Sequence, residues 1–171
     1  MKTLILYSSH DGQTKKISEF LTALLEGDIT VAALKEDYEI EGFDRVIIGA
    51  SIRYGHFNKM VYRFVTRHRF HLEQKSAVFF GVNLTARKAG KDSPETNVYV
   101  RKFLQRTKWQ PKLAAVFAGA LFYPRYKWFD RVMIQFIMKI TSGETDASKE
   151  IEYTDWDKVA QFAQQINELN K

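Results

Sequence analysis

The chain has 171 residues, 45% of them hydrophobic and 27% charged, with a formal net charge of +6. This size and composition are typical of one globular domain with a sizeable core, and we expect a single domain over residues 1–171. The chain has no cysteine, which excludes disulfides, thiolate metal sites and cysteine nucleophiles. The sequence shows no signal-peptide pattern and no apolar run of the roughly 20 residues that span a bilayer.

Apolar runs alternate with segments of helical periodicity along the chain. Five runs are predicted to be strands buried on both faces of a parallel sheet, because their apolar residues are continuous: residues 3–7, 29–34, 45–50, 77–83 and 113–121. Apolar residues at helical spacing predict helices over Ile17 to Leu25 and over Val61 to Leu72. Ser93 followed by Pro94 predicts a further helix start, and Thr154 and Asp155 open a final helix. This alternation indicates an α/β fold with a doubly wound five-stranded parallel sheet.

The first predicted strand leads into the polar turn "YSSHDGQTKKI", from Tyr7 to Ile17. Ligands of open α/β sheets bind beyond the carboxyl ends of the strands, where a helix N-terminus offers unpaired N–H groups. Ser9 and Thr14 can add hydroxyl donors, and Gly12 lets the main chain approach an anion. The turn lacks the lysine of a P-loop and the three glycines of a dinucleotide fingerprint. It therefore predicts a site for a phosphomonoester held mainly by neutral donors.

The same residues resemble the FMN-phosphate signature of flavodoxins. Two apolar residues and an aromatic one, Ile5 to Tyr7, precede a hydroxyl, a small residue and then Thr14; Ser18 stands where alanine is usual. The resemblance implies FMN, and two further loops complete the expected site. Tyr54 and Gly55 follow the third strand, where an aromatic ring could stack on the flavin. Asn83 and Thr85 follow the fourth strand and could bond the heteroatoms of its ring system.

A more specific resemblance covers nearly the whole chain. The segments "IGASIRYGH", "VNLTARK", "YPRYKWFDR" and "GETD" are similar to those of the flavodoxin-like, menaquinone-dependent protoporphyrinogen IX dehydrogenases. Membership would imply FMN-dependent oxidation of protoporphyrinogen IX to protoporphyrin IX in haem biosynthesis, with menaquinone or ubiquinone as acceptor. The cofactor-binding residues implied are Ser9, His10, Asp11, Gly12, Gln13, Thr14, Ala50, Ser51, Ile52, Arg53, Tyr54, Gly55, Val82, Asn83, Leu84, Thr85 and Asp146. No catalytic base is identified.

An insertion over about residues 122–146 separates the fifth strand from the last helix, where a direct turn would suffice. Lys127, Arg131, Gln135 and Lys139 recur every four residues in it, and large apolar side chains cover the rest of this predicted helix. Such a helix could lie on an anionic membrane surface, so we expect a peripheral protein at the cytoplasmic face of the cell membrane. The alternative is that the apolar side chains pack on the core of the protein. Four cations are candidates for pairing the propionates of the substrate: Arg87, Arg125, Lys127 and Arg131.

Other functions fit parts of the sequence. A flavodoxin-type electron carrier or an NAD(P)H:quinone reductase could use the same scaffold, although carriers are generally acidic. Nine basic residues lie between Tyr99 and Gly143 against one acidic residue, Asp130, but they are interleaved with aliphatic residues, and we expect no nucleic-acid partner. The four histidines have no evident acidic companion in the sequence, so no metal site is expected. The sequence leaves the oligomeric state open.

Overall fold

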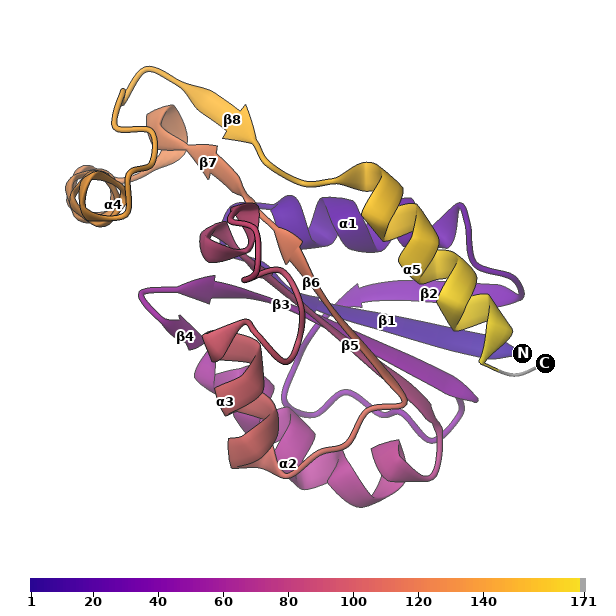
Figure 1. The fold of residues 1–171 in the computed structure, drawn as a ribbon. Helices are drawn as coiled ribbons and strands as arrows, with labels where there is room; N and C mark the ends of the chain where they lie inside the picture. Colours follow the sequence, from indigo (N-terminus) through magenta and orange to yellow (C-terminus); the bar gives the residue numbers. More distant parts are fainter. Residues whose placement is uncertain (170–171) are drawn as a thin grey trace.

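The computed structural model describes residues 1–169 and has a central sheet of five parallel strands (Figure 1). The strands are β1 (Lys2–Ser8), β2 (Asp28–Ala33), β3 (Arg45–Arg53), β5 (Ser76–Asn83) and β6 (Leu113–Ala118). Their order in the sheet is β2-β1-β3-β5-β6, the doubly wound order of flavodoxin-like folds. The predicted fold class is therefore confirmed. A short strand, β4 (His56–Phe57), turns back antiparallel against the end of β3.

Helices cover both faces of the sheet. The helices α1 (Gln13–Thr22) and α5 (Trp156–Glu168) share one apolar cluster with the sheet, whereas α2 (Lys59–Glu73) and α3 (Val98–Thr107) share the other. Successive residues of a strand point to opposite faces, so Leu4 and Leu6 pack toward α2 and α3 while Ile5 packs toward α1 and α5. These three side chains have no exposed surface, and each burial stabilises the fold by about 1.5–3 kcal/mol.

The predicted fifth strand is wrong at its end. The run 113–121 is continuously apolar, but β6 ends at Ala118 and Gly119 breaks it. The chain then leaves the sheet as β7 (Ala120–Phe122), which pairs antiparallel with β8 (Glu150–Glu152). The inserted unit therefore spans residues 120–152, more than the predicted 122–146.

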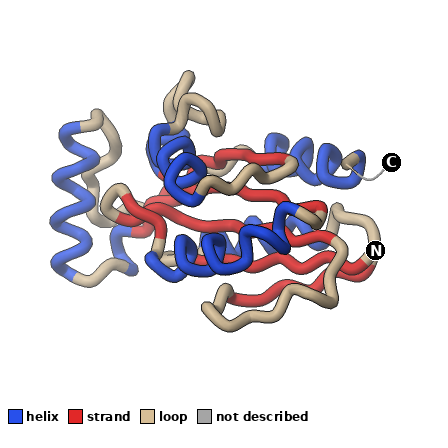
Figure 2. Tube along the Cα trace, turned by 90° about the horizontal axis from the view of Figure 1, so that it is seen from below, coloured by secondary structure: helices blue, strands red, loops and turns tan. Residues whose placement is uncertain are grey.

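Between β7 and β8 lies α4 (Trp128–Ile140). The inserted unit has an apolar cluster of its own, with Leu121, Tyr123, Tyr126, Ile134 and Met138 as its buried residues. Figure 2 shows α4 along its length at one end of the molecule, apart from the helices that cover the sheet. Within residues 1–169, no helix combines the length and the apolar character that crossing a membrane requires.

One predicted helix start needs correction, and another is confirmed. Asn97, not Ser93, caps α3, since its side chain accepts a hydrogen bond from Val100 N. The Ser93 hydroxyl instead accepts from Thr96 N at 3.2 Å within the preceding turn. Asp155 caps α5 by accepting from Lys158 N. The segment before α3 offers two residues able to cap, Ser93 and Asn97, and the surrounding fold decides that Asn97 does.

Candidate functional site

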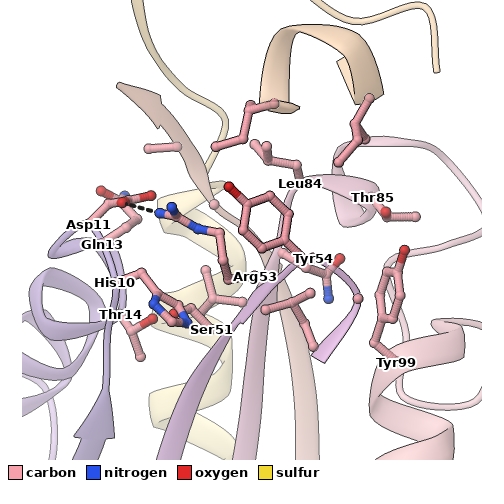
Figure 3. A pocket seen from close by; sticks show the side chains of 18 of the residues that line it. His10, Asp11, Gln13, Thr14, Ser51, Arg53, Tyr54, Leu84, Thr85 and Tyr99 are labelled. Atoms are coloured by element: carbon pink, nitrogen blue, oxygen red, sulfur yellow. Dashed lines mark hydrogen bonds and ion pairs between the residues drawn. The ribbon is translucent and has the colours of Figure 1, made fainter. Parts of the chain in front are cut away.

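A cavity of about 560 Å³ lies beyond the carboxyl ends of the strands, within the size range of sites for small-molecule ligands. Three loops line it, those following β1, β3 and β5, and α4 closes it from the other side (Figure 3). The fold thus brings together the three loops that the sequence analysis singled out. The residues from these loops are Ser9, His10, Asp11, Gln13, Thr14, Ser51, Ile52, Arg53, Tyr54, Gly55, Val82, Asn83, Leu84 and Thr85.

Three of the residues proposed to bind the cofactor lie outside the lining of this cavity. Gly12 shapes the first loop, and Ala50 is fully buried in β3. Asp146 is exposed and accepts hydrogen bonds from Ser148 N and the Ser148 hydroxyl. Among the four cations proposed for the propionates, Arg87 lines the cavity, whereas Arg125, Lys127 and Arg131 do not.

The loop after β1 has the geometry of a phosphate cradle. Gly12 has a φ of +92°, which favours glycine, and a Cβ there would meet nothing within 4 Å. Gly12 N donates to Ser9 Oγ at 2.9 Å, and α1 begins at the next residue, so the first N–H groups of the helix lie at this loop. Thr14 is fully buried, and its hydroxyl has no hydrogen-bond partner among the described residues. A buried unpaired hydroxyl costs about 1–3 kcal/mol, so the cradle fits a phosphate that would accept from it.

Two polar residues of the cavity already have protein partners. The Gln13 amide donates to Glu152 at 3.1 Å and to Thr154 at 2.9 Å, which ties α1 to the inserted unit. The Asn83 side chain exchanges hydrogen bonds with Asn97 and accepts from Ala86 N. We therefore expect Gln13 to contribute to ligand binding through its main chain and Asn83 by shaping its loop.

A charged network joins the first two loops to the inserted unit. Arg53 contacts Asp11 at 2.5 Å and Asp130 at 3.6 Å (Figure 3 shows the Asp11 pair). The Tyr54 hydroxyl donates to Asp130, and the Tyr126 hydroxyl donates to Asp11 at 3.3 Å. The network holds the start of α4 over the mouth of the cavity.

His10 and Arg87 differ in the charge that they bring to the cavity. Burial and the Arg53 guanidinium lower the pKa of His10, so its imidazole is neutral at pH 7. Arg87 carries a permanent charge; it donates to Leu84 O at 2.7 Å and to the Thr141 hydroxyl at 3.3 Å. Arg87 therefore bridges the loop after β5 and the end of α4.

Residues of the inserted unit and its neighbours also line the cavity, and the sequence did not predict them. Along α4 they recur at helical spacing, which was a usable signal for one helix face, although the sequence could not show where that face points. Tyr126 lies within the segment "YPRYKWFDR". The missed lining residues are Tyr99, Gly119, Ala120, Tyr126, Met133, Ile134, Ile137, Met138 and Thr141.

The other side of α4 is exposed. Trp128, Phe129, Phe136 and Ile140 have 60–73% of their surface accessible. Large side chains of this kind rarely cluster on the surface of a protein without a partner. The packing alternative is therefore confirmed for one side of the helix, where Ile134 and Met138 are buried. The opposite side has no packing partner among the described residues, and its contact with a membrane stays a prediction.

We predict that two tyrosines in the inserted unit titrate at unusually high pH. Burial raises the pKa of Tyr123 and of Tyr126 to about 12, against 10 in the unfolded chain. Because the folded state holds these protons more tightly, the stability that they contribute is complete below pH 10 and is lost as the pH rises toward 12. Absorbance of tyrosinate should show both steps, and Y123F and Y126F should each remove one. A wild-type titration complete near pH 10 would contradict the burial seen here.

Comparison with known proteins identifies the family. The family model described as a flavodoxin domain matches residues 4–148. A protein of Escherichia coli (strain K12) named protoporphyrinogen IX dehydrogenase (quinone) is 49% identical over 174 aligned positions, covering 99% of this chain and 96% of its own. A Leishmania major protein of the same name is 49% identical over 168 positions, covering 95% of this chain and 73% of its own.

Solved structures agree on the fold. Oxidised flavodoxin 1 from Bacillus cereus has a TM-score of 0.56 at 17% identity, with 97% of each chain covered. A flavodoxin from the domain Archaea has a TM-score of 0.54 at 15% identity, covering 98% of this chain and 97% of its own. At such identities the likeness shows the fold alone, but the sequence matches go further. The chain belongs to the family of flavodoxin-domain protoporphyrinogen IX dehydrogenases.

Proposed function

We propose that this protein is an FMN-dependent enzyme that oxidises protoporphyrinogen IX to protoporphyrin IX and delivers the electrons to menaquinone or ubiquinone. The names of its relatives support the substrate and a quinone acceptor. The observation that carries the proposal is the shape of the cavity: polar loops with a phosphate cradle on one side and an apolar helix on the other. A flavin and a large apolar substrate could both be accommodated there.

FMN would be held chiefly by the first loop. Its phosphate would accept from the main-chain N–H groups at the start of α1 and from the hydroxyls of Ser9 and Thr14. The positive end of the α1 dipole would add to this binding without a charged side chain. Tyr54 and Thr85 line the part of the cavity expected to face the ring system. When bound, FMN supplies a two-electron acceptor, so three turnovers would account for the six electrons of the oxidation.

The substrate side of the cavity is apolar, and Arg87 lines it without an acidic partner among the described residues. Met133, Ile137 and Met138 form the wall that α4 contributes. Methionine side chains adapt to irregular shapes, which suits a flexible, non-planar macrocycle. Arg53 is already paired with Asp11 and Asp130, whereas the partners of Arg87 are two carbonyls and a hydroxyl. We therefore assign one propionate of the substrate to Arg87.

We predict that R87Q raises the Michaelis constant for protoporphyrinogen at least tenfold, because a charge-assisted hydrogen bond contributes about 1.5–3 kcal/mol. FMN content, read from flavin absorbance, should stay near that of the wild type. R125Q is the contrasting variant, since Arg125 pairs with Glu150 at 2.8 Å outside the cavity. Equal Michaelis constants for R87Q and the wild type would exclude Arg87 from binding the propionate.

The exposed side of α4 supports binding of the protein to a membrane surface. Its exposed aromatic and aliphatic side chains could enter the lipid interface, while Lys127 and Lys139, also exposed, reach anionic headgroups. The same helix lines the cavity, so a quinone dissolved in the bilayer would have a short path to the site. We therefore place the protein peripherally on the cytoplasmic face of the cell membrane.

The deciding experiment is anaerobic growth of porphyrin fluorescence from protoporphyrinogen. Purified protein loaded with FMN should produce porphyrin when a quinone is added, and faster when the quinone is supplied in anionic vesicles. Protein denatured by heat and a quinone-free mixture are the controls. Porphyrin formation no faster than in the controls would refute the proposal. Rapid oxidation of NAD(P)H in the same mixture would favour an NAD(P)H:quinone reductase instead.

A further inference from the structure

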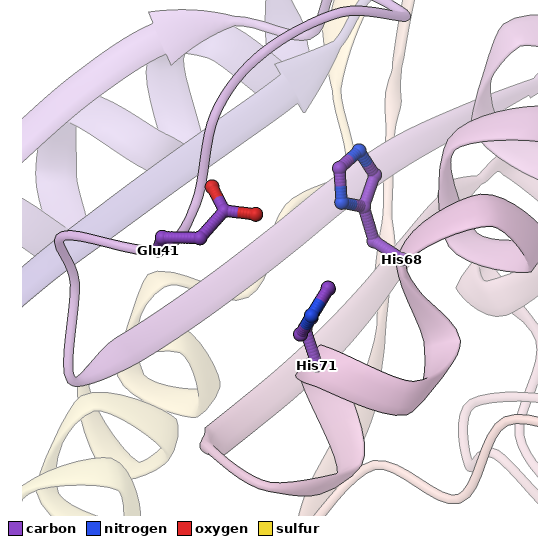
Figure 4. A group of neighbouring side chains, drawn as sticks. All are labelled: Glu41, His68 and His71. Carbon is purple, nitrogen blue, oxygen red and sulfur yellow. The ribbon is translucent and has the colours of Figure 1, made fainter.

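At the opposite end of the sheet from the cavity, three potential metal ligands meet. Glu41 belongs to the loop between β2 and β3, and His68 and His71 lie near the end of α2 (Figure 4). One ligand atom from each side chain lies within 4.8 Å of the other two. From the sequence alone no metal site is expected, because the histidines have no evident acidic companion in it. The fold supplies that companion from a distant loop.

The backbone on both sides of the cluster is fixed. His68 and His71 are three residues apart on α2, so their side chains share one face of the helix. The Lys75 ammonium donates to Glu41 O at 3.3 Å and to Phe43 O at 2.7 Å, which anchors the loop to the chain just after α2. Ile40 N donates to Glu41 Oε2 at 3.0 Å, and a carboxylate retains further lone pairs for a metal.

The ring of His68 is held in place beside Glu41 and His71. His68 Nε2 is buried and has no hydrogen-bond partner among the described residues. The ring of His68 lies against Phe64, with 4.5 Å between the ring centroids, so its orientation is restricted. His71 occupies the last turn of α2, where the negative end of the helix dipole favours a cation.

We propose that Glu41, His68 and His71 bind one zinc ion. Two imidazoles and a carboxylate are a common zinc ligand set, and water would complete the tetrahedron. Zinc bonds of about 2.0–2.1 Å place tetrahedral ligands about 3.4 Å apart. The ligand atoms lie within 4.8 Å of one another, so they must move closer by at most about 1.4 Å. The ion would cross-link the loop between β2 and β3 to α2 and so stabilise this end of the sheet. Arg67, a positive neighbour of His68, opposes the ion, and the affinity should be micromolar rather than nanomolar.

Calorimetric titration of metal-free, FMN-loaded protein with zinc chloride tests the proposal. One ion should bind per chain, and zinc at about 100 times its dissociation constant should raise the Tm by about 5–11 °C. E41Q and H71Q should each weaken binding at least tenfold, with the Tm of the metal-free protein unchanged. E39Q, a neighbouring exposed carboxylate in the same loop, and H56Q, an exposed histidine on β4, are the matched controls.

Cobalt provides a second measurement of the same site. Co²⁺ bound by two imidazoles and a carboxylate should give visible d–d absorption, measured in flavin-free protein and removed by H71Q. The proposal is overturned if zinc fails to bind at millimolar concentration. It is equally overturned if E41Q and H71Q bind zinc as tightly as E39Q and H56Q. Both outcomes can be measured on flavin-free protein as well, so they do not depend on whether the cavity binds FMN.

Discussion

Replacing Thr14 by valine should stabilise the flavin-free protein and weaken FMN binding at the same time. The Thr14 hydroxyl is buried without a partner in the described chain, so its removal should raise the free energy of unfolding by about 1 kcal/mol. In the complex the same hydroxyl would donate to the phosphate, and losing a hydrogen bond to a charged group costs about 1.5–3 kcal/mol. The dissociation constant of FMN should therefore rise about 10- to 100-fold.

Urea unfolding and flavin fluorescence titration measure the two effects separately. The matched control is T3V, because Thr3 is also fully buried with an unpartnered hydroxyl but lies near the start of β1, away from the cavity. T3V should stabilise the protein in the same way and leave FMN affinity unchanged. If T14V binds FMN as tightly as T3V does, the cradle is not the phosphate site.

Removing the exposed apolar side of α4 should abolish membrane binding without harming the fold. The variant replaces Trp128, Phe129, Phe136 and Ile140 by serine; all four are largely exposed, so little native packing is lost. Burying each such side chain in the lipid interface contributes about 1.5–3 kcal/mol. Their combined loss should lower partitioning into anionic vesicles at least 100-fold, as measured by co-sedimentation.

Activity measured with two kinds of quinone distinguishes a role of these four side chains in membrane binding from a role in catalysis. With a quinone embedded in vesicles the serine variant should be slow, whereas a water-soluble quinone analogue should restore its turnover. F70S is the control, since Phe70 on α2 is 68% exposed but lies outside the inserted unit. Vesicles of neutral lipid should bind the wild type more weakly, because Lys127 and Lys139 contribute about 1 kcal/mol each on an anionic surface. If F70S and the serine variant co-sediment with vesicles to the same extent, the exposed side of α4 does not bind the membrane.

Much of the fold could be predicted because its signals are local. The strands are continuous apolar runs, and the side chains of α1 and α2 recur at the helical period, so neighbouring residues suffice to recognise them. The three loops of the cavity could be located for the same reason, since each directly follows a predicted strand and parallel strands end at one edge. The polar turn from Ser9 to Thr14 even indicated the kind of ligand, because glycine and hydroxyl residues at a helix start suit a phosphate.

The sequence by itself determined the sheet, its covering helices and the edge where the ligand would bind. Only the tertiary structure decided what the inserted unit does. Gly119 ends β6, and β7 pairs with β8, which is distant in sequence; the rotation of α4 then depends on packing of Ile134 and Met138 with Leu121 and Tyr123. Glu41 meets His68 and His71 for the same reason. Periodicity shows that a helix or strand has two sides, but long-range contacts decide what each side faces.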